Sequence, residues 1–198
     1  MTSKRERALD AAVELLGTQG LRSLTHARVD ERAGLPRGST SNYFRTRAAL
    51  VDGVVEWVAQ HELTNFDPGA DPATADDLVD LLCAALEMQT GEFRTRTMAR
   101  YVLFLEATRD ADTQAVLMAN RRRFERWSER ILTSLHAPNP KGAARVLMAF
   151  AEGLVLHRLT VDPDAPLRPS VAMVIKACLE PTGSEGYGSS SPGRISTG

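Results

Sequence analysis

The sequence has few of the residues and motifs from which enzyme active sites are built. Its 198 residues include two cysteines and four histidines, and the histidines have no metal-ligand spacing. A phosphate-cradling glycine loop, a nucleophile elbow, an HExxH motif and a paired CxxC motif are all missing. We therefore expect no enzymatic activity, no metal site and no cofactor.

Long apolar runs are missing as well. The sequence has neither a secretory signal nor a stretch of about 18 apolar residues, which a membrane-spanning helix needs. Cys83 and Cys178 both lie in apolar helical patterns, which favours buried packing over a disulfide or a redox sensor. We expect a protein of the reducing cytoplasm with no membrane partner.

The third absence is that of β-strand patterns. Apolar and polar residues do not alternate over any useful length, whereas apolar residues recur every three or four positions, as they do in helices. We predict an all-α fold of about nine helices. Gly, Ser and Pro dominate after Pro181, so residues 182–198 are predicted to be a disordered tail. The longer predicted helices cover residues 4–18, 74–90, 93–109, 113–136, 140–160 and 168–180.

Residues 24–50 have the spacing of a helix-turn-helix. Thr25 can cap a short helix, because its hydroxyl can accept a hydrogen bond from a backbone N–H at the helix start. Gly34 gives the backbone the freedom to leave this helix, and Pro36 fits the first position of a second helix. Thr46 can cap the helix that follows.

The second helix of this motif, from Arg37 to Tyr43, is small and polar and has little to bury in a core. The major groove of DNA is about 12 Å wide, so it admits one α-helix and offers the hydrogen-bonding edges of the bases. Arg37 suits guanine, Asn42 suits adenine, and Gly38 allows the backbone to approach a sugar-phosphate strand. The alternative is a short exposed helix on an all-α bundle. The residues predicted to contact DNA are Thr25, His26, Arg28, Arg37, Gly38, Ser39, Thr40, Asn42, Tyr43 and Arg47.

The charge distribution favours the same end of the chain. Residues 1–50 hold nine Lys and Arg against five Asp and Glu, a balance of +4, although the net charge of the whole chain is −1. A local positive excess attracts a phosphate backbone, while the acidic remainder limits indiscriminate binding to nucleic acid. The charges therefore support the motif without proving it.

Over residues 5–58 the sequence resembles the N-terminal domain of the TetR family of bacterial transcriptional regulators. The resemblance rests on an amphipathic first helix that ends at Gly20, followed in order by Leu24-Thr25, Ala33-Gly34-Leu35, Gly38, Tyr43-Phe44 and Arg47 before Leu50. It implies an all-helical homodimer, DNA reading by the third helix and a C-terminal ligand domain. We therefore divide the chain into a helix-turn-helix DNA-binding domain (1–47), a helical ligand-binding and dimerisation domain (48–181) and the tail (182–198).

The chain departs from the family pattern at two positions of the motif. Ser41 stands where the family often has a tyrosine, and its shorter side chain reaches less far toward a phosphate. Asp30 stands where the family commonly has a small residue, and we expect it to offset Arg32 or to face solvent.

Aromatic residues and methionines recur on successive helices of the second domain. With a few polar groups among them, such residues are typical of a small-molecule pocket, and methionine adapts to irregular ligands. Ordinary core packing is the alternative for each of them, and the family resemblance favours the pocket. The residues predicted to bind a ligand are Trp57, Met88, Met98, Tyr101, Phe104, Leu105, Phe124, Trp127, Phe150 and His157; Phe93 and Met148 belong to the same apolar set.

The last two long helices, 140–160 and 168–180, each carry an apolar stripe. In the TetR family these helices form a two-fold interface with a partner, which implies dimerisation here; internal packing in a monomer is the alternative. The sequence thus predicts a repressor that binds a palindromic DNA operator as a homodimer and is released by a small-molecule ligand. The alternatives are a DNA-binding regulator signalled by a protein partner and a helical interaction protein that does not bind DNA.

Overall fold

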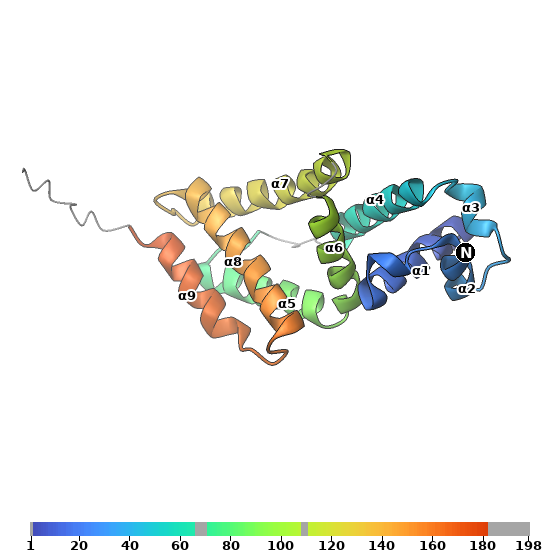
Figure 1. The fold of residues 1–198 in the computed structure, drawn as a ribbon. Coiled ribbons are helices and arrows are strands. Elements are labelled where there is room, and N and C mark those ends of the chain that lie inside the picture. The colour runs from blue at the N-terminus through green and yellow to red at the C-terminus, as the bar shows by residue number, and fades with distance from the viewer. Residues whose placement is uncertain (1, 66–70, 108–110, 182–198) are drawn as a thin grey trace, which may run out of the picture.

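The computed structural model describes residues 2–65, 71–107 and 111–181, and the regular structure in these ranges is entirely helical. It contains nine α-helices and one short 3₁₀ turn, so the predicted all-α fold is confirmed. The molecule is elongated, with the first three helices at one end and the last helix at the other (Figure 1). The predicted tail, 182–198, lies outside the described residues.

The N-terminal end is a compact group of helices around one core. Ser3 begins the first helix with a capping box, in which its side chain and that of Glu6 each accept a hydrogen bond from the other residue's backbone N–H. The elements are α1 (Lys4–Gln19), η1 (Leu21–Ser23), α2 (His26–Ala33), α3 (Ser39–Tyr43) and α4 (Arg47–Asn65).

Five longer helices follow, close to the ranges that the sequence predicts. Thr74 caps the first of them in a second capping box, and Asn139 caps the fourth with Pro140 at its first turn. They are α5 (Ala75–Thr90), α6 (Arg94–Ala107), α7 (Ala111–Ser134), α8 (Pro140–Thr160) and α9 (Leu167–Leu179).

Two apolar clusters hold the molecule together, and α6 belongs to both. The first cluster joins α1, α2 and α4, and it includes Ala99 and Leu103 from α6. The second joins α5, α7, α8 and α9, with Met98 and Tyr101 of α6 packed against it. Because each fully buried leucine contributes about 2 kcal/mol, the packing of Leu103 alone ties α6 firmly to the N-terminal helices.

Contact between α6 and α1 is unusually close at one point. Gly17 of α1 lies against the backbone of Thr95, and a Cβ at this glycine would overlap the Thr95 carbonyl. The two helices can therefore touch backbone to backbone only because residue 17 has no side chain.

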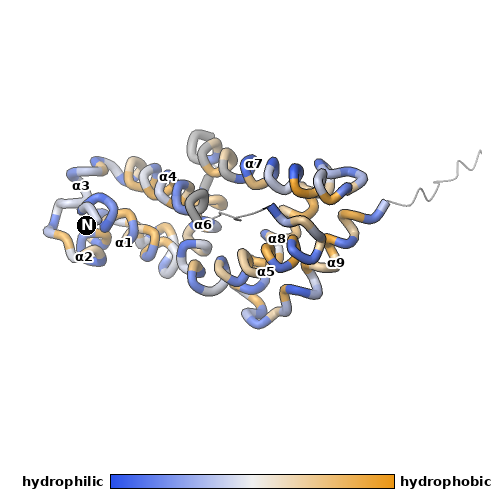
Figure 2. Tube along the Cα trace, turned by 180° about the vertical axis from the view of Figure 1, so that it is seen from behind, coloured by the Kyte–Doolittle hydropathy of each residue, from blue (hydrophilic) through white to orange (hydrophobic). Residues whose placement is uncertain are grey.

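Hydrophobic and hydrophilic residues are interspersed along each helix rather than gathered in long apolar segments (Figure 2). None of the helices in the described ranges is long and apolar enough to cross a membrane.

Candidate functional site

The start of α2, its end at Gly34 and the start of α4 are built as the sequence predicts. The Thr25 hydroxyl accepts a hydrogen bond from the backbone N–H of Arg28 (3.4 Å) and so caps α2. Gly34 ends the helix in the left-handed conformation, with φ of 60° and ψ of 39°. Thr46 accepts a hydrogen bond from the N–H of Ala49 (3.1 Å) at the start of α4.

The start of α3 differs from the prediction, which placed Pro36 at the first helical position. The helix begins at Ser39, because Gly38 takes a left-handed conformation (φ 86°) that interrupts any earlier helix. Arg37 therefore lies in the turn before α3, where its side chain is exposed. This backbone conformation requires a glycine at position 38, independently of how closely that glycine approaches a bound DNA strand.

Asp30 of α2 explains why α3 begins where it does. Its carboxylate accepts hydrogen bonds from the N–H of Gly38 (2.8 Å) and from both the N–H (2.8 Å) and the hydroxyl (2.6 Å) of Thr40. Only 2% of its surface is exposed. Burial by itself raises the pKa of this carboxyl group, but the hydrogen bonds from Thr40 and Gly38 outweigh burial, and the pKa lies below its ordinary value.

Neither environment expected for Asp30 was right. It does not face solvent, and Arg32 pairs instead with Glu14 of α1. The carboxylate is the cap of a helix that starts nine residues later, so it holds the predicted reading helix against α2.

Three of the predicted DNA-contacting residues are exposed on α3 and on the turn before it. Arg37, Asn42 and Tyr43 are all exposed, Tyr43 to 47%. Among the described residues, neither a hydrogen bond nor an ion pair holds the Arg37 side chain. The Ser39 hydroxyl, in contrast, donates to the carbonyl of Pro36 (2.6 Å), which closes the turn.

The prediction that Thr40 contacts DNA is wrong. Its side chain is completely buried (0% exposed), and its hydroxyl donates to Asp30, so it has no surface to offer a DNA strand. Its place inside the motif follows from the position of Asp30 on α2, which sequence periodicity does not reveal.

His26, Arg28 and Arg47, which are also predicted to contact DNA, lie on α2 and α4. The Nε2 atom of His26 lies 2.6 Å from the carbonyl of Phe44, so this nitrogen donates a hydrogen bond within the protein. Arg28 donates to the side chain of Gln19, and Arg47 donates to the carbonyl of Leu21 (2.9 Å). Both arginines stay exposed while these bonds fix their direction.

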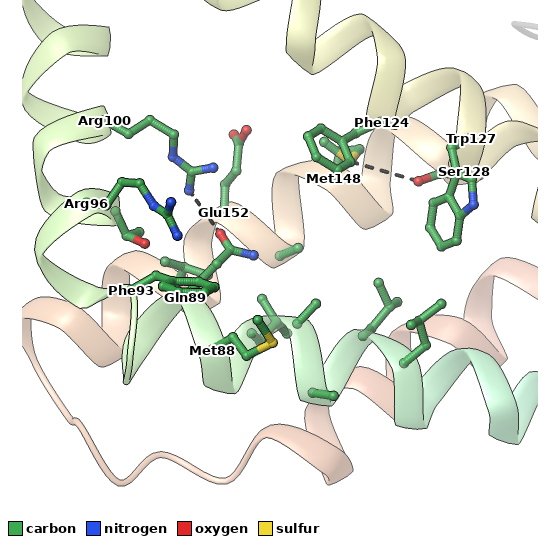
Figure 3. A pocket seen from close by; sticks show the side chains of 18 residues that line it. Met88, Gln89, Phe93, Arg96, Arg100, Phe124, Trp127, Ser128, Met148 and Glu152 are labelled. Carbon is green, nitrogen blue, oxygen red and sulfur yellow. Dashed lines mark hydrogen bonds between the residues drawn. The ribbon is translucent and has the colours of Figure 1, made fainter. Parts of the chain in front are cut away.

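A cavity of about 250 Å³ lies between α5, α6, α7 and α8 (Figure 3). Its two ends differ in chemistry: polar and charged side chains gather beside α6, and aromatic and methionine side chains gather beside α7 and α8. The lining residues are Leu81, Leu82, Ala84, Ala85, Leu86, Met88, Gln89, Phe93, Arg96, Thr97, Arg100, Phe124, Trp127, Ser128, Met148, Ala151, Glu152 and Val155.

The polar end contains two guanidinium groups. Arg100 donates to the side-chain oxygen of Gln89 (3.1 Å), and the guanidinium of Arg96 lies over the ring of Phe93, 4.1 Å from its centre. Glu152 is the carboxylate at this end, and it forms an ion pair with Arg121 of α7.

Three of the predicted ligand-binding residues, Met88, Phe124 and Trp127, line this cavity. Phe93 and Met148, from the same apolar set, line it too. The other predicted residues lie elsewhere: Met98, Tyr101 and Phe150 pack against the second apolar cluster, Trp57 and Phe104 pack against the first, and Leu105 and His157 are exposed.

The sequence reasoning missed the polar residues of the cavity. The predicted ligand contacts were mainly aromatic residues and methionines, and they did not include Gln89, Glu152 and the two arginines. The spacing of Arg96 and Arg100, one helical turn apart between apolar residues, was a signal that could have identified this end of the pocket.

A second, shallower hollow lies beside the cavity, where α1 and α4 meet the start of α6. Phe93 and Arg96 line both spaces. On the other side of the hollow, the indole N–H of Trp57 donates to Asp10 (2.9 Å), and the ring of His61 packs on the Trp57 ring at 4.1 Å.

Comparison with known families decides what kind of protein this is. Residues 8–54 match the family described as bacterial regulatory proteins, tetR family, and residues 73–181 match the tetracyclin repressor-like C-terminal domain. The chain belongs to the TetR family. It is therefore a transcription regulator with an N-terminal helix-turn-helix for DNA and a C-terminal domain for ligands.

Several solved structures have the same fold along nearly the whole chain. A transcriptional regulator from Rhodococcus sp. Rha1 has a TM-score of 0.73 at 19% identity, over 90% of this chain and 96% of its own. The multidrug binding protein EbrR, in complex with ethidium, has a TM-score of 0.63 at 25% identity, over 90% and 99%. SmeT, the repressor of the Stenotrophomonas maltophilia multidrug efflux pump SmeDEF, has a TM-score of 0.65 at 20% identity, over 90% and 89%. No curated protein matches this chain in sequence.

Proposed function

We propose that this TetR-family regulator is a homodimeric repressor that binds a palindromic operator through α3 and leaves it when a small molecule occupies the cavity. The observation that carries the proposal is the position of α6, which lines the cavity with one face and packs on the DNA-binding helices with the other. EbrR, which binds ethidium, supports a ligand-responsive role for a chain of this fold.

The two faces of α6 are distinct. Arg96, Thr97 and Arg100 line the cavity, whereas Ala99 and Leu103 are buried in the first apolar cluster with α1 and α4. A ligand that shifts α6 must therefore also shift α1, because the Gly17 contact leaves no side chain to absorb the movement.

This coupling acts as a population shift between two arrangements of the dimer. A two-fold dimer reads successive major grooves about 34 Å apart, so a small change in the separation of its α3 helices disfavours the operator. A ligand that binds one arrangement better moves the equilibrium toward it, and DNA must then weaken ligand binding by the same factor.

The outer surface of α8 and α9 supports dimerisation. Many apolar residues of these helices pack inside the chain, including Leu147 and Ile175, but another face of each helix remains exposed and apolar. Two identical copies of such a face can bury each other in a two-fold interface. The exposed residues of this α8–α9 face are Val146, Ala149, Gly153 and Leu156 on α8 and Pro169, Met173 and Ala177 on α9.

A regulator of transcription must reach the chromosome, and we therefore place the chain in the bacterial cytoplasm. We also propose that the chain is divided into residues 1–47, residues 48–181 and a tail. Although α4 lies mostly in the second range, its apolar face packs in the first cluster.

The proposal is tested by selecting a random DNA duplex library on the purified protein at near-physiological salt. We expect an enriched palindrome for the unchanged protein and for Arg123→Ala, an exposed arginine of α7. Arg37→Ala should lose about 1–3 kcal/mol of binding on the selected site and relax one base position.

The alternatives give different results in the same experiment. A palindrome that no small molecule releases would favour a regulator signalled by a protein partner. A folded protein that enriches no sequence would favour the helical interaction protein and would overturn the assignment of α3 to the major groove.

A further inference from the structure

We propose that the cavity binds an amphipathic carboxylic acid, with its carboxylate beside α6 and a compact apolar body extending toward α7 and α8. The inference rests on the proposed function in one respect, since it takes this cavity as the effector site. It adds the chemical class of the effector and the end of the cavity at which the charge is recognised.

The charges that line the cavity are predominantly positive. Arg96 and Arg100 lie one turn apart on α6, so both guanidinium groups reach the same end of the cavity (Figure 3). The single lining carboxylate, Glu152, is already paired with Arg121, which cancels its charge locally. Two of the three charged residues that line the cavity are therefore arginines, and a carboxylate brought to this end lies beside both of them.

The geometry of arginine suits a carboxylate. A planar guanidinium donates two parallel hydrogen bonds to the two oxygens of a carboxylate, and such charge-assisted bonds are stronger than those between neutral groups. The side-chain amide of Gln89, which accepts from Arg100, offers an N–H donor of its own beside the same end. Because the cavity walls are largely apolar, these interactions are screened less than they would be at the surface.

The other end of the cavity has no charge to satisfy. Phe124, Met148 and Trp127 face it from α7 and α8, with Met88 opposite on α5 (Figure 3). The hydroxyl of Ser128 donates a hydrogen bond to the sulfur of Met148 (3.9 Å). An aromatic or short aliphatic body buries apolar surface here against Phe124, Met148 and Trp127.

A cationic ligand fits this arrangement poorly. It would have to draw Glu152 away from Arg121 and then lie beside two guanidinium groups of the same charge. A neutral ligand would gain the apolar contacts but not the charge-assisted ones.

The test uses three probes that share a naphthalene body and differ in the group at position 2: naphthalene-2-carboxylate, naphthalene-2-carboxamide and naphthalen-2-ylmethylammonium. Their binding to the full chain is measured by isothermal titration calorimetry at neutral pH, which does not depend on an operator. We expect the carboxylate to bind about tenfold or more tighter than the carboxamide, with the ammonium weakest.

The variants locate the effect. Arg96→Gln and Arg100→Gln should each reduce the preference for carboxylate over carboxamide, while Arg122→Gln, an exposed arginine of α7 outside the cavity, should preserve it. Glu152→Gln should strengthen carboxylate binding, because it leaves the charge of Arg121 near the site. A larger effect of Arg122→Gln than of Arg100→Gln would overturn the assignment to the cavity.

Equal affinity for carboxylate and carboxamide, preference for the ammonium, or no measurable binding of any probe would each overturn the inference. These results are distinct from failure of the proposed function. A chain that selects an operator but binds no carboxylate is still a regulator, and one that binds the carboxylate in the cavity but selects no operator is not a repressor.

Discussion

At the scale of single residues, Asp30 decides the geometry of the DNA-binding surface. The helix α3 has only five residues, so it makes few hydrogen bonds of its own and depends on its cap. Asp30 supplies that cap from another helix, with three hydrogen bonds to Gly38 and Thr40. The exposed Arg37, in the turn before α3, and Asn42, on α3, are therefore positioned by a buried carboxylate from α2.

Replacing Asp30 by asparagine should destabilise the protein by about 1–3 kcal/mol at neutral pH, because the amide cannot accept all three hydrogen bonds. Glu31→Gln, an exposed neighbour on α2, is the matched control and should have little effect. Chemical denaturation followed by circular dichroism measures the difference. Equal stability of Asp30→Asn and the unchanged protein would show that the cap is dispensable.

The same residue predicts a dependence on pH. The folded-state pKa of Asp30 is lowered from its unfolded value of about 3.9. The carboxylate thus contributes stability that is complete above the unfolded pKa and is lost as the pH falls through the folded pKa. In the denaturation experiment, the gap between the unchanged protein and Asp30→Asn should be widest near neutral pH and should narrow below about pH 4. A gap that widens in acid would contradict this sign.

At the scale of the elements, α6 is a helix that packs against both halves of the molecule. Its residues belong to both apolar clusters, and its backbone touches α1 at Gly17. The sequence could not reveal this role, because periodicity shows that a helix has apolar faces but not which neighbour each face meets.

Gly17→Ala tests the contact between α1 and α6. The added methyl group overlaps the Thr95 carbonyl, so we expect a loss of about 1–3 kcal/mol in unfolding free energy and a reduced effect of ligand on operator affinity. Thr18→Ala, an exposed neighbour on α1, should change neither quantity appreciably. Urea denaturation and operator titrations with and without ligand provide the two measurements; a Gly17→Ala protein with unchanged values in both would show that the helices separate freely.

How far the sequence predicts the structure also differs between elements. The long helices, the Thr25 and Thr46 caps and the Gly34 turn follow from local patterns, so they were predicted close to their observed places. The start of α3 and the burial of Thr40 depend on Asp30, which comes from α2, and were therefore missed. The cavity residues were found only in part for the same reason, since the packing of four helices decides which side chains face it.

At the scale of the whole molecule, the long axis separates α3 at one end from α8 and α9 toward the other end (Figure 1). A dimer joined through α8 and α9 would leave both α3 helices free. The apolar side chains on the α8–α9 face are the ones that an aqueous monomer would leave in contact with water.

Met173→Glu should convert the proposed dimer to a monomer, because this side chain is 71% exposed in the single chain and a buried carboxylate at a two-fold axis would face its own copy. Leu105→Glu is the control, because it introduces the same side chain at an apolar residue that is 74% exposed on α6, away from that face. Sedimentation velocity reports the mass of each variant. A dimer that survives Met173→Glu but not Leu105→Glu would place the interface on α6 instead.

The double position of Phe93 and Arg96, in the wall of the cavity and in the hollow beside α1 and α4, bears on how such a protein diverges. Under the proposed function, a substitution at either residue would alter both the effector site and the packing beside α1 and α4. Phe124 and Met148 line the cavity but not the hollow, so a substitution there would change the cavity alone. Descendants of this chain that acquire new effectors should therefore change first at the α7 and α8 wall, while the α6 wall stays nearly constant.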